Sequence, residues 1–272
     1  SFMDKFRRIW ATKNPNDEWW SSFVTSPLAV VCNWFVVDIA WITPNLITPL
    51  SFIVALASAV FICLGSSEES LGTAFYVTAA VLIHGSHILD CMDGQMARYR
   101  GTLSRSGGFY DKATDHLQVF VWFGAIAYAG YAQTKDVTLI FLAFIGVCFY
   151  ALRGYVKYVA IHSEMERDKE YLTEISRASA ALQKQLDEFG GLDKGLGNNL
   201  MWFLKEQRKL FNFDEGVFVF MLSLALIFPS TLIPMLWVFA VSQGFWGIIR
   251  CCQRGQQLAH DQHPDSPKIP DK

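Results

Sequence analysis

Residues 72–97 read GTAFYVTAAVLIHGSHILDCMDGQMA and combine a long apolar run with two carboxylates near its end. The first 18 of these residues, up to Leu89, contain no Asp, Glu, Lys or Arg. An α-helix of about 20 apolar residues spans the roughly 30 Å hydrocarbon core of a bilayer. The stretch therefore predicts a membrane-spanning helix with Asp90 and Asp93 at its far end.

The rest of the chain has the same character. Of its 272 residues 52% are hydrophobic and 18% are charged, which is more apolar than an ordinary soluble domain of this size. A proline after threonine, Thr43-Pro44-Asn45, opens the first apolar run. We therefore predict an all-α, polytopic membrane protein with six transmembrane helices. They cover about residues 45–64, 72–97, 107–130, 137–160, 214–231 and 232–250.

Composition also excludes some classes of function. A net charge of −2, without a basic surface interleaved with aromatic residues, argues against a nucleic-acid partner. The six cysteines lack the C-x-x-C spacing of a zinc site and do not form a disulfide framework.

The N-terminal segment, residues 1–41, has the composition of a membrane interface. Lysines and arginines alternate with tryptophans between residues 4 and 20, and residues 26–41 are apolar but too short to span. We predict that residues 26–41 form an interfacial helix that precedes the six spans.

Positive charge predicts the orientation, because Lys and Arg are enriched in cytoplasmic loops. Basic residues follow the second and last predicted spans: Arg98, Arg100, Arg105, Lys112, Arg250 and Arg254. The connections around 65–71 and at Pro229 carry no Lys or Arg and should face outside. Both termini of this multi-pass integral membrane protein are then cytoplasmic.

The predicted domains are this N-terminal segment, a six-helix transmembrane domain over residues 42–252 and a polar tail over residues 253–272. Within the second, residues 163–213 form a cytoplasmic insert that begins with charged residues and continues as an amphipathic helix. Residues 200–210 resemble a second interfacial helix. We expect disorder after Arg254.

Four carboxylates converge at the second and third predicted spans. Asp90 and Asp93 are three residues apart and Asp111 and Asp115 four apart, so each pair shares one helical face. Carboxylates near bilayer depth cost about 2.5–3.5 kcal/mol each unless a cation compensates them. Because all four offer only oxygen, the pattern predicts a hard ion, Mg²⁺ or Mn²⁺.

Three histidines also lie near these carboxylates in the sequence: His84, His87 and His116. Hard ions favour oxygen ligands, so we do not expect these histidines to bind the metal.

From Asp90 to Asp115 the chain fits the pattern D-x2-D-G-x2-A-R-x8-G-x3-D-x3-D without a departure. In this it resembles the CDP-alcohol phosphotransferase (CDP-alcohol phosphatidyltransferase) family. That family includes phosphatidylinositol, phosphatidylserine and phosphatidylglycerol-phosphate synthases and choline/ethanolamine phosphotransferases. The close match covers 26 residues, and the six-span layout extends a looser resemblance over most of the chain.

The resemblance implies an enzyme of phospholipid biosynthesis with a cytosol-facing active site. There Asp90, Asp93, Asp111 and Asp115 would bind the metal on the diphosphate of a CDP-linked donor. By the same resemblance Asp115 would deprotonate the acceptor hydroxyl, and CMP would leave.

The resemblance also implies which residues bind the donor in addition to Asp90. Gly94, Ala97 and Gly107 match small positions that let cytidine approach the helix backbones, and Arg98 matches a position that holds phosphate. The chemistry agrees, because Gly permits close approach and Arg offers a planar fork of donors.

The motif does not show whether the lipid or the polar alcohol is the activated partner. Tyr155-x-Lys157, with Arg153, resembles a basic acceptor-pocket position of phosphoinositol and phosphoglycerol synthases, although snorkelling to the interface explains these residues equally well. Members that accept phosphorylated alcohols carry an arginine-containing stretch at the start of the fifth span, where this chain has Asp214 and Glu215. An acidic pair fits an uncharged polyol or an amine, and ordinary interfacial solvation is the alternative.

Two other classes of protein also use membrane aspartates. A Mg²⁺-dependent prenyltransferase needs two separated aspartate motifs, and only one acidic cluster is present here. A non-enzymatic cation transporter does not require Gly94, Ala97 and Arg98. The expected partners are therefore the CDP-linked donor, an alcohol or lipid acceptor and membrane lipids, and the resemblance suggests a homodimer.

Overall fold

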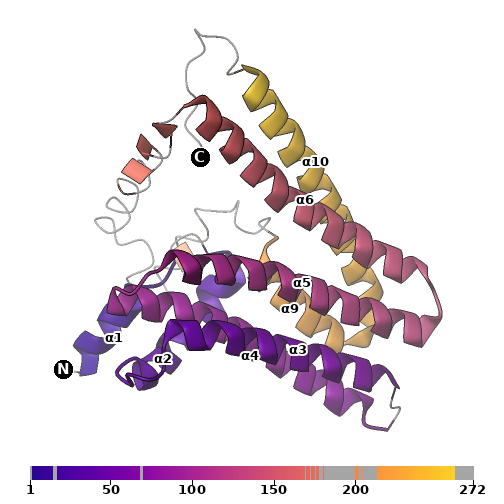
Figure 1. Cartoon of the computed structure of the whole chain (residues 1–272). Coiled ribbons are helices and arrows are strands. Elements are labelled where there is room, and N and C mark those ends of the chain that lie inside the picture. The colour runs from indigo at the N-terminus through magenta and orange to yellow at the C-terminus, as the bar shows by residue number, and fades with distance from the viewer. Residues whose placement is uncertain are drawn as a thin grey trace.

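The computed structural model describes residues 2–14, 17–67, 70–168 and 213–260, together with a few positions between 170 and 204. All regular structure in these residues is helical, which confirms the all-α prediction (Figure 1). The helices are α1 (Phe2–Trp10), η1 (Ser21–Thr25), α2 (Ser26–Val36), α3 (Pro44–Ser67), α4 (Gly72–Arg100), α5 (Arg105–Thr134), α6 (Thr138–Arg167), α9 (Glu215–Ile227), η3 (Pro229–Thr231) and α10 (Leu232–His260).

Four helical segments of the described chain are long and apolar enough to cross a membrane. They are α3, α4, α6 and Pro229–Ala259, which contains most of α10. At the fifth predicted span, α9 has 13 residues and is therefore about 20 Å long, which is shorter than a hydrocarbon core. At the third, polar His116, Gln118 and Gln133 interrupt the apolar run of α5. Four of the six predicted spans are thus supported by length and composition.

Two buried polar side chains of α5 donate hydrogen bonds to serines of α3. Gln118 Nε2 donates to Ser51 Oγ of α3 at 3.3 Å, and Trp122 Nε1 donates to Ser58 Oγ at 3.1 Å. Both Gln118 and Trp122 are fully buried. A buried polar group is tolerated when it is hydrogen-bonded, so these contacts explain why α5 lies inside the bundle despite its modest hydropathy.

The helices pack in two groups that share one core. The first consists of α3, α4 and α5, and the second of α6 alongside α10, with α9 against α4 (Figure 1). The ring of Phe123 stacks on that of Phe239 with centroids 3.6 Å apart. A Cβ added at Gly146 would lie 2.3 Å from the same Phe239 ring, so glycine is what allows α6 to approach α10.

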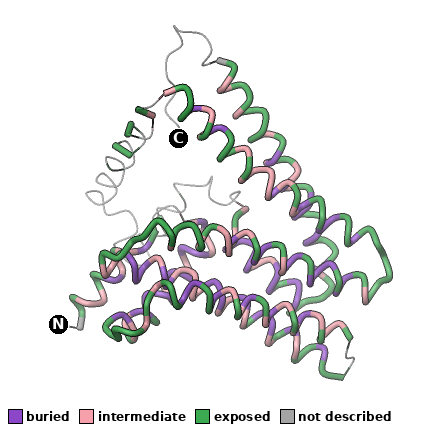
Figure 2. The backbone as a smooth tube through the Cα atoms, in the orientation of Figure 1, coloured by how far each residue is buried: buried purple, intermediate pink, exposed green. Residues whose placement is uncertain are grey.

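The outer faces of the helices are exposed (Figure 2), and many of the exposed side chains are large and apolar. Leu50, Val81, Phe144 and Val241 are among the large hydrophobic side chains on these faces. Soluble monomers rarely expose so much contiguous apolar surface, whereas a lipid-facing surface requires it.

Several helix boundaries differ from those predicted. The first span begins at Pro44 as expected, but α2 ends at Val36 rather than at residue 41. Helix α6 continues to Arg167, into the predicted insert, and the other helices predicted between residues 169 and 213 lie outside the described residues.

The prediction of disorder after Arg254 is wrong for residues 255–260, because α10 continues to His260. Arg250 Nη1 donates to Gln253 Oε1 at 3.2 Å and Arg254 Nη1 to Gln257 Oε1 at 2.9 Å. Such pairs, three residues apart on a helix surface, support a polar helix beyond the apolar part. Hydropathy therefore marks the end of the apolar part of α10, and the helix itself ends later.

Candidate active site

One cavity of about 470 Å³ opens where α4, α5, α6, α9 and the N-terminal segment meet. Eight of its lining residues are acidic and four are Lys or Arg. The acidic residues are Asp17, Glu18, Asp90, Asp93, Asp111, Asp115, Asp214 and Glu215. An excess of carboxylates in a confined space favours bound cations.

The turn between α4 and α5 brings the four predicted aspartates into this cavity. Gly101 ends α4 in the left-handed conformation, with a φ of 65°, and its N–H bonds back into the last turn. Ser104 Oγ then accepts a hydrogen bond from Gly107 N at 3.0 Å and caps α5. The chain reverses within a few residues, and the end of α4 faces the start of α5.

Three of these carboxylates are close enough to share an ion. One oxygen from each of Asp90, Asp93 and Asp111 lies within 4.8 Å of the others. Asp93 is 5% exposed and accepts a hydrogen bond from Thr48 Oγ1 of α3. The buried Asp90 Oδ1 has no hydrogen-bond partner among the described residues. A set of converging oxygen atoms, one of them without a partner, fits a hard divalent cation.

Asp115 lies beside this group and is differently placed. It is 5% exposed, and its Oδ2 accepts from Lys112 Nζ at 2.8 Å. The same Nζ is 3.2 Å from Asp111 Oδ2. The second oxygen of Asp115, Oδ1, is buried and has no hydrogen-bond partner in the part of the chain that the structure describes.

The four residues that the motif associates with the nucleotide do not all line the cavity. Gly94 and Arg98 do. A Cβ at Gly94 would lie 3.2 Å from Arg98 Nη1, and Arg98 Nε donates to Thr12 O at 2.6 Å. Ala97 and Gly107 lie outside the lining of this cavity, and a Cβ at Gly107 would lie 2.8 Å from the Ser104 Oγ that caps α5.

The four residues proposed for the acceptor pocket, Arg153, Lys157, Asp214 and Glu215, all line the cavity. Arg153 Nη2 donates to Phe213 O at 3.1 Å, which ties α6 to the start of α9. Asp214 caps α9 by accepting from Glu215 N at 3.1 Å. Glu215 accepts a hydrogen bond from Tyr150 at 3.2 Å.

A family model described as CDP-alcohol phosphatidyltransferase matches residues 41–183, more than half of the chain. The chain belongs to the CDP-alcohol phosphatidyltransferase family. This membership confirms the resemblance seen in the aspartate motif. With the apolar helices described above, it identifies the chain as an integral membrane protein.

Two individual proteins are similar to this member of the CDP-alcohol phosphatidyltransferase family. Cholinephosphotransferase 1 of Xenopus laevis is 28% identical over 142 residues, 51% of this chain and 35% of that protein. The chain thus spans about a third of the length of that relative. The crystal structure of Mycobacterium tuberculosis phosphatidylinositol phosphate synthase (PgsA1) with CDP-DAG bound has a TM-score of 0.51 at 19% identity, and the match covers 86% of this chain and 92% of that one. The likeness to PgsA1 is one of fold.

The N-terminal segment lines the cavity, which the motif did not indicate. Asp17, Glu18, Ser21 and Ser26 all contribute to the lining. They precede the part of the chain that matches the CDP-alcohol phosphatidyltransferase family. No local spacing relates them to the aspartates, since the contacts that place them join residues more than 60 positions apart, such as Ser21 Oγ to His87 Nε2 at 2.8 Å.

Glu18 is the most buried acid of this segment, with 4% of its surface exposed. Burial raises its pKa from 4.5 to about 7, although the N–H groups of Trp20 and Ser21 donate to its carboxylate. A Cβ added at Gly216 would overlap Glu18 Oε1, so a side chain at this position of α9 would displace the Glu18 carboxylate.

The raised pKa of Glu18 predicts a pH-dependent stability. Between pH 4.5 and about 7 the folded chain keeps this proton while the unfolded chain releases it, so the stability of the folded state falls as the pH rises through this window. The loss is complete above about pH 7 and amounts to about 3 kcal/mol at most. Glu18→Gln removes the titration. We expect its thermal midpoint, relative to that of the wild type, to rise between pH 4.5 and 7.5, and parallel pH curves would contradict the prediction.

Proposed function

We propose that this chain transfers a substituted phosphate group from a CDP-linked donor to a hydroxyl and releases CMP. The observation that carries the proposal is the convergence of Asp90, Asp93 and Asp111 in one cavity, with Asp115 buried beside them. These four aspartates also complete the motif of the family to which the chain belongs.

In this proposal Asp90, Asp93, Asp111 and Asp115 hold Mg²⁺ or Mn²⁺. When bound, the ion neutralises charge on the donor diphosphate and on the leaving CMP. Gly94 leaves room for the donor beside α4, and Arg98 offers its guanidinium to a phosphate, oriented by the hydrogen bond to Thr12. Ala97, which is buried in α4, and Gly107, which lies against the Ser104 cap of α5, act indirectly through helix packing and capping.

Asp115 is the proposed general base. The Lys112 ammonium binds one of its oxygens, and the other has no protein partner among the described residues. An acceptor hydroxyl can therefore reach this second oxygen without displacing a described group. Asp115 takes the hydroxyl proton as the acceptor oxygen attacks the phosphorus farther from cytidine. The bond from that phosphorus to the CMP oxygen breaks, and CMP carries away the released charge.

The acidic residues at one end of the cavity favour some acceptors over others by charge. The carboxylates of Asp214, Glu215 and Asp17 would repel a phosphorylated alcohol, so we propose that the polar partner is an uncharged polyol or an amine-bearing alcohol. Lys157 and Arg153 also line the cavity, where Arg153 is bound to Phe213 O.

A CMP-release screen tests the reaction and the substrate class together. The full chain, purified with Mg²⁺ or Mn²⁺, is given CDP-diacylglycerol, CDP-choline, CDP-ethanolamine or CDP-inositol, each crossed with alcohols, their phosphates and diacylglycerol. We expect CMP from at least one pairing that lacks a phosphorylated acceptor. CMP release only with phosphorylated acceptors would overturn the substrate assignment, and release with no pairing would overturn the reaction.

The orientation of the cavity is a separate proposal, supported by the basic residues at the ends of α4 and α10. We place both termini and the cavity on the cytoplasmic side, and we propose a homodimer on the family resemblance. A cysteine introduced at position 105 of a cysteine-free variant should resist a membrane-impermeant thiol reagent in intact cells and react after the cells are opened. Labelling from outside would reverse the orientation.

A further inference from the structure

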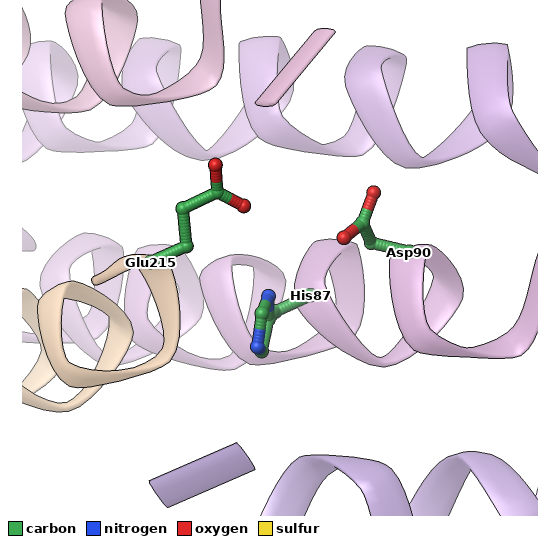
Figure 3. A group of neighbouring side chains, drawn as sticks. All are labelled: His87, Asp90 and Glu215. Atoms are coloured by element: carbon green, nitrogen blue, oxygen red, sulfur yellow. The ribbon is translucent and has the colours of Figure 1, made fainter. Parts of the chain in front are cut away.

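A second group of side chains that could hold a metal ion lies next to the four aspartates. One ligand atom from each of His87, Asp90 and Glu215 lies within 4.8 Å of the others. His87 and Asp90 are one helical turn apart on α4, and Glu215 is the first residue of α9. Figure 3 shows the imidazole and the two carboxylates facing one space between these helices.

His87 has a nitrogen that nothing in the described chain satisfies. The side chain is 5% exposed, Nε2 is 2.8 Å from Ser21 Oγ, and the buried Nδ1 has no hydrogen-bond partner among the described residues. A buried polar atom without a partner needs an explanation, and a bound ion is one. Metal-ligating histidines commonly donate their other ring N–H to an oxygen, which is the role that Ser21 can fill here.

The neighbouring histidine shows what a structural role looks like in the same place. His84 lies one turn earlier on α4, and both of its ring nitrogens have partners. Its Nδ1 is 3.0 Å from Ala80 O and 3.1 Å from Ser223 Oγ, and its Nε2 accepts from Trp20 Nε1 at 3.2 Å. Neither ring nitrogen of His84 is therefore left for a ligand, whereas Nδ1 of His87 is.

Each carboxylate of the group also has an oxygen atom that is available to a ligand. Asp90 Oδ1 is buried without a partner in the described residues. Tyr150 donates to Oε1 of Glu215, which leaves the second oxygen of this carboxylate for a ligand. The nearby cations are bound elsewhere, Lys112 to Asp111 and Asp115 and Arg153 to Phe213 O. The local charge is therefore negative and favours a cation.

We propose that His87, Asp90 and Glu215 bind a divalent transition-metal ion of the Zn²⁺ type, separate from the hard ion of the four aspartates. One imidazole nitrogen and two carboxylates suit Zn²⁺ better than Mg²⁺, and three protein ligands leave a coordination position open to the cavity. The two sites share Asp90, whose two oxygens can serve one ion each. This assignment does not depend on the CDP chemistry, because it concerns metal binding by the chain alone.

Equilibrium dialysis against Zn²⁺ tests the proposal with the full chain after treatment with a chelator. We expect His87→Asn and Glu215→Gln each to weaken Zn²⁺ binding at least tenfold, while His84→Asn, the matched control on the same helix, keeps the wild-type affinity. Asp93→Asn, which disables only the hard-ion site, should still bind one Zn²⁺. Binding of Zn²⁺ should also raise the thermal midpoint of the wild type and not that of His87→Asn.

Two results would overturn the assignment: wild-type Zn²⁺ affinity in either ligand variant, or Zn²⁺ binding that disappears entirely in Asp93→Asn. The thermal midpoint of each metal-free variant is compared with that of the wild type to check that the variant folds. If one of the two ligand variants does not fold, the other decides, since His87 and Glu215 lie on different helices. Co²⁺ bound to the unmodified chain gives a measurement that needs no variant. A four- or five-coordinate site with nitrogen absorbs visibly, whereas the weak absorption of an octahedral all-oxygen site alone would contradict the proposal.

Discussion

Replacing Asp93 by asparagine should lower CMP release about a thousandfold at limiting Mg²⁺. The change keeps the size of the side chain and an oxygen for the Thr48 hydroxyl, but it removes one of three converging charges. Metal stabilisation of a diphosphate in the transition state is worth several kcal/mol, and about 4 kcal/mol corresponds to a factor of roughly a thousand in rate. Initial rates over a series of Mg²⁺ concentrations measure the effect.

Two further variants make this result specific. Thr48→Val leaves the Asp93 charge and removes its hydrogen-bond donor, so we expect a smaller loss, about 10- to 100-fold, that added Mg²⁺ partly restores. Asp136→Asn makes the same chemical change on an exposed residue that accepts a hydrogen bond from Thr138 N, and it should leave the rate unchanged. Full activity of Asp93→Asn at limiting Mg²⁺ would remove Asp93 from the metal site.

The features that could be predicted from the sequence are those that depend on neighbours within one or two helical turns. Asp90 and Asp93 lie on one face of α4 because they are three residues apart, and Pro44 begins α3 because proline is tolerated in the first turn of a helix. That the end of α4 and the start of α5 face the same cavity also followed, since only a few residues join the two helices. The aspartates that we propose as metal ligands could therefore be named from their spacing along the chain.

The features that were missed depend on contacts between distant residues. The wall formed by Glu18 and Ser21 comes from a segment whose composition indicated only a membrane interface, and nothing near His87 in the sequence indicates that Ser21 binds its Nε2. His87 was excluded as a metal ligand because hard ions prefer oxygen. The position of Glu215 beside it could not be predicted, since it follows from the packing of α9 on α4. Tertiary packing, and not spacing along the chain, creates this second group of ligands.

The number of spans was also not predictable from local hydropathy. Gln118 lowers the hydropathy of α5 but is fully buried and bonded to Ser51, so a polar residue in a window does not exclude a buried helix. In α9 the opposite holds, because the helix is strongly apolar after Glu215 but its 13 residues are too few to span alone. A partner on another helix decides the first case, and the length of the helix decides the second.

Asp115→Asn should separate turnover from donor binding. The asparagine cannot accept the hydroxyl proton, so we expect kcat to fall by about 10²- to 10⁴-fold, the usual contribution of a general base. Asp115 Oδ1 has no partner among the described residues, and Asp90, Asp93 and Asp111 converge without it. Donor binding should therefore weaken much less than turnover, because three of the four proposed metal ligands remain in place. Steady-state rates measure kcat, and equilibrium dialysis with a labelled CDP-linked donor measures binding.

The matched comparison is Asp111→Asn, which removes the same charge from the same face of α5 one turn earlier. Because Asp111 belongs to the converging group, its loss should weaken donor binding and turnover together. Lys112 contacts both carboxylates, at 3.2 Å for Asp111 and 2.8 Å for Asp115, so loss of its ion pair is common to the two variants and cannot produce a difference between them. If Asp115→Asn lost donor binding to the same extent as turnover, Asp115 would be a metal ligand only, and another group would have to take the hydroxyl proton.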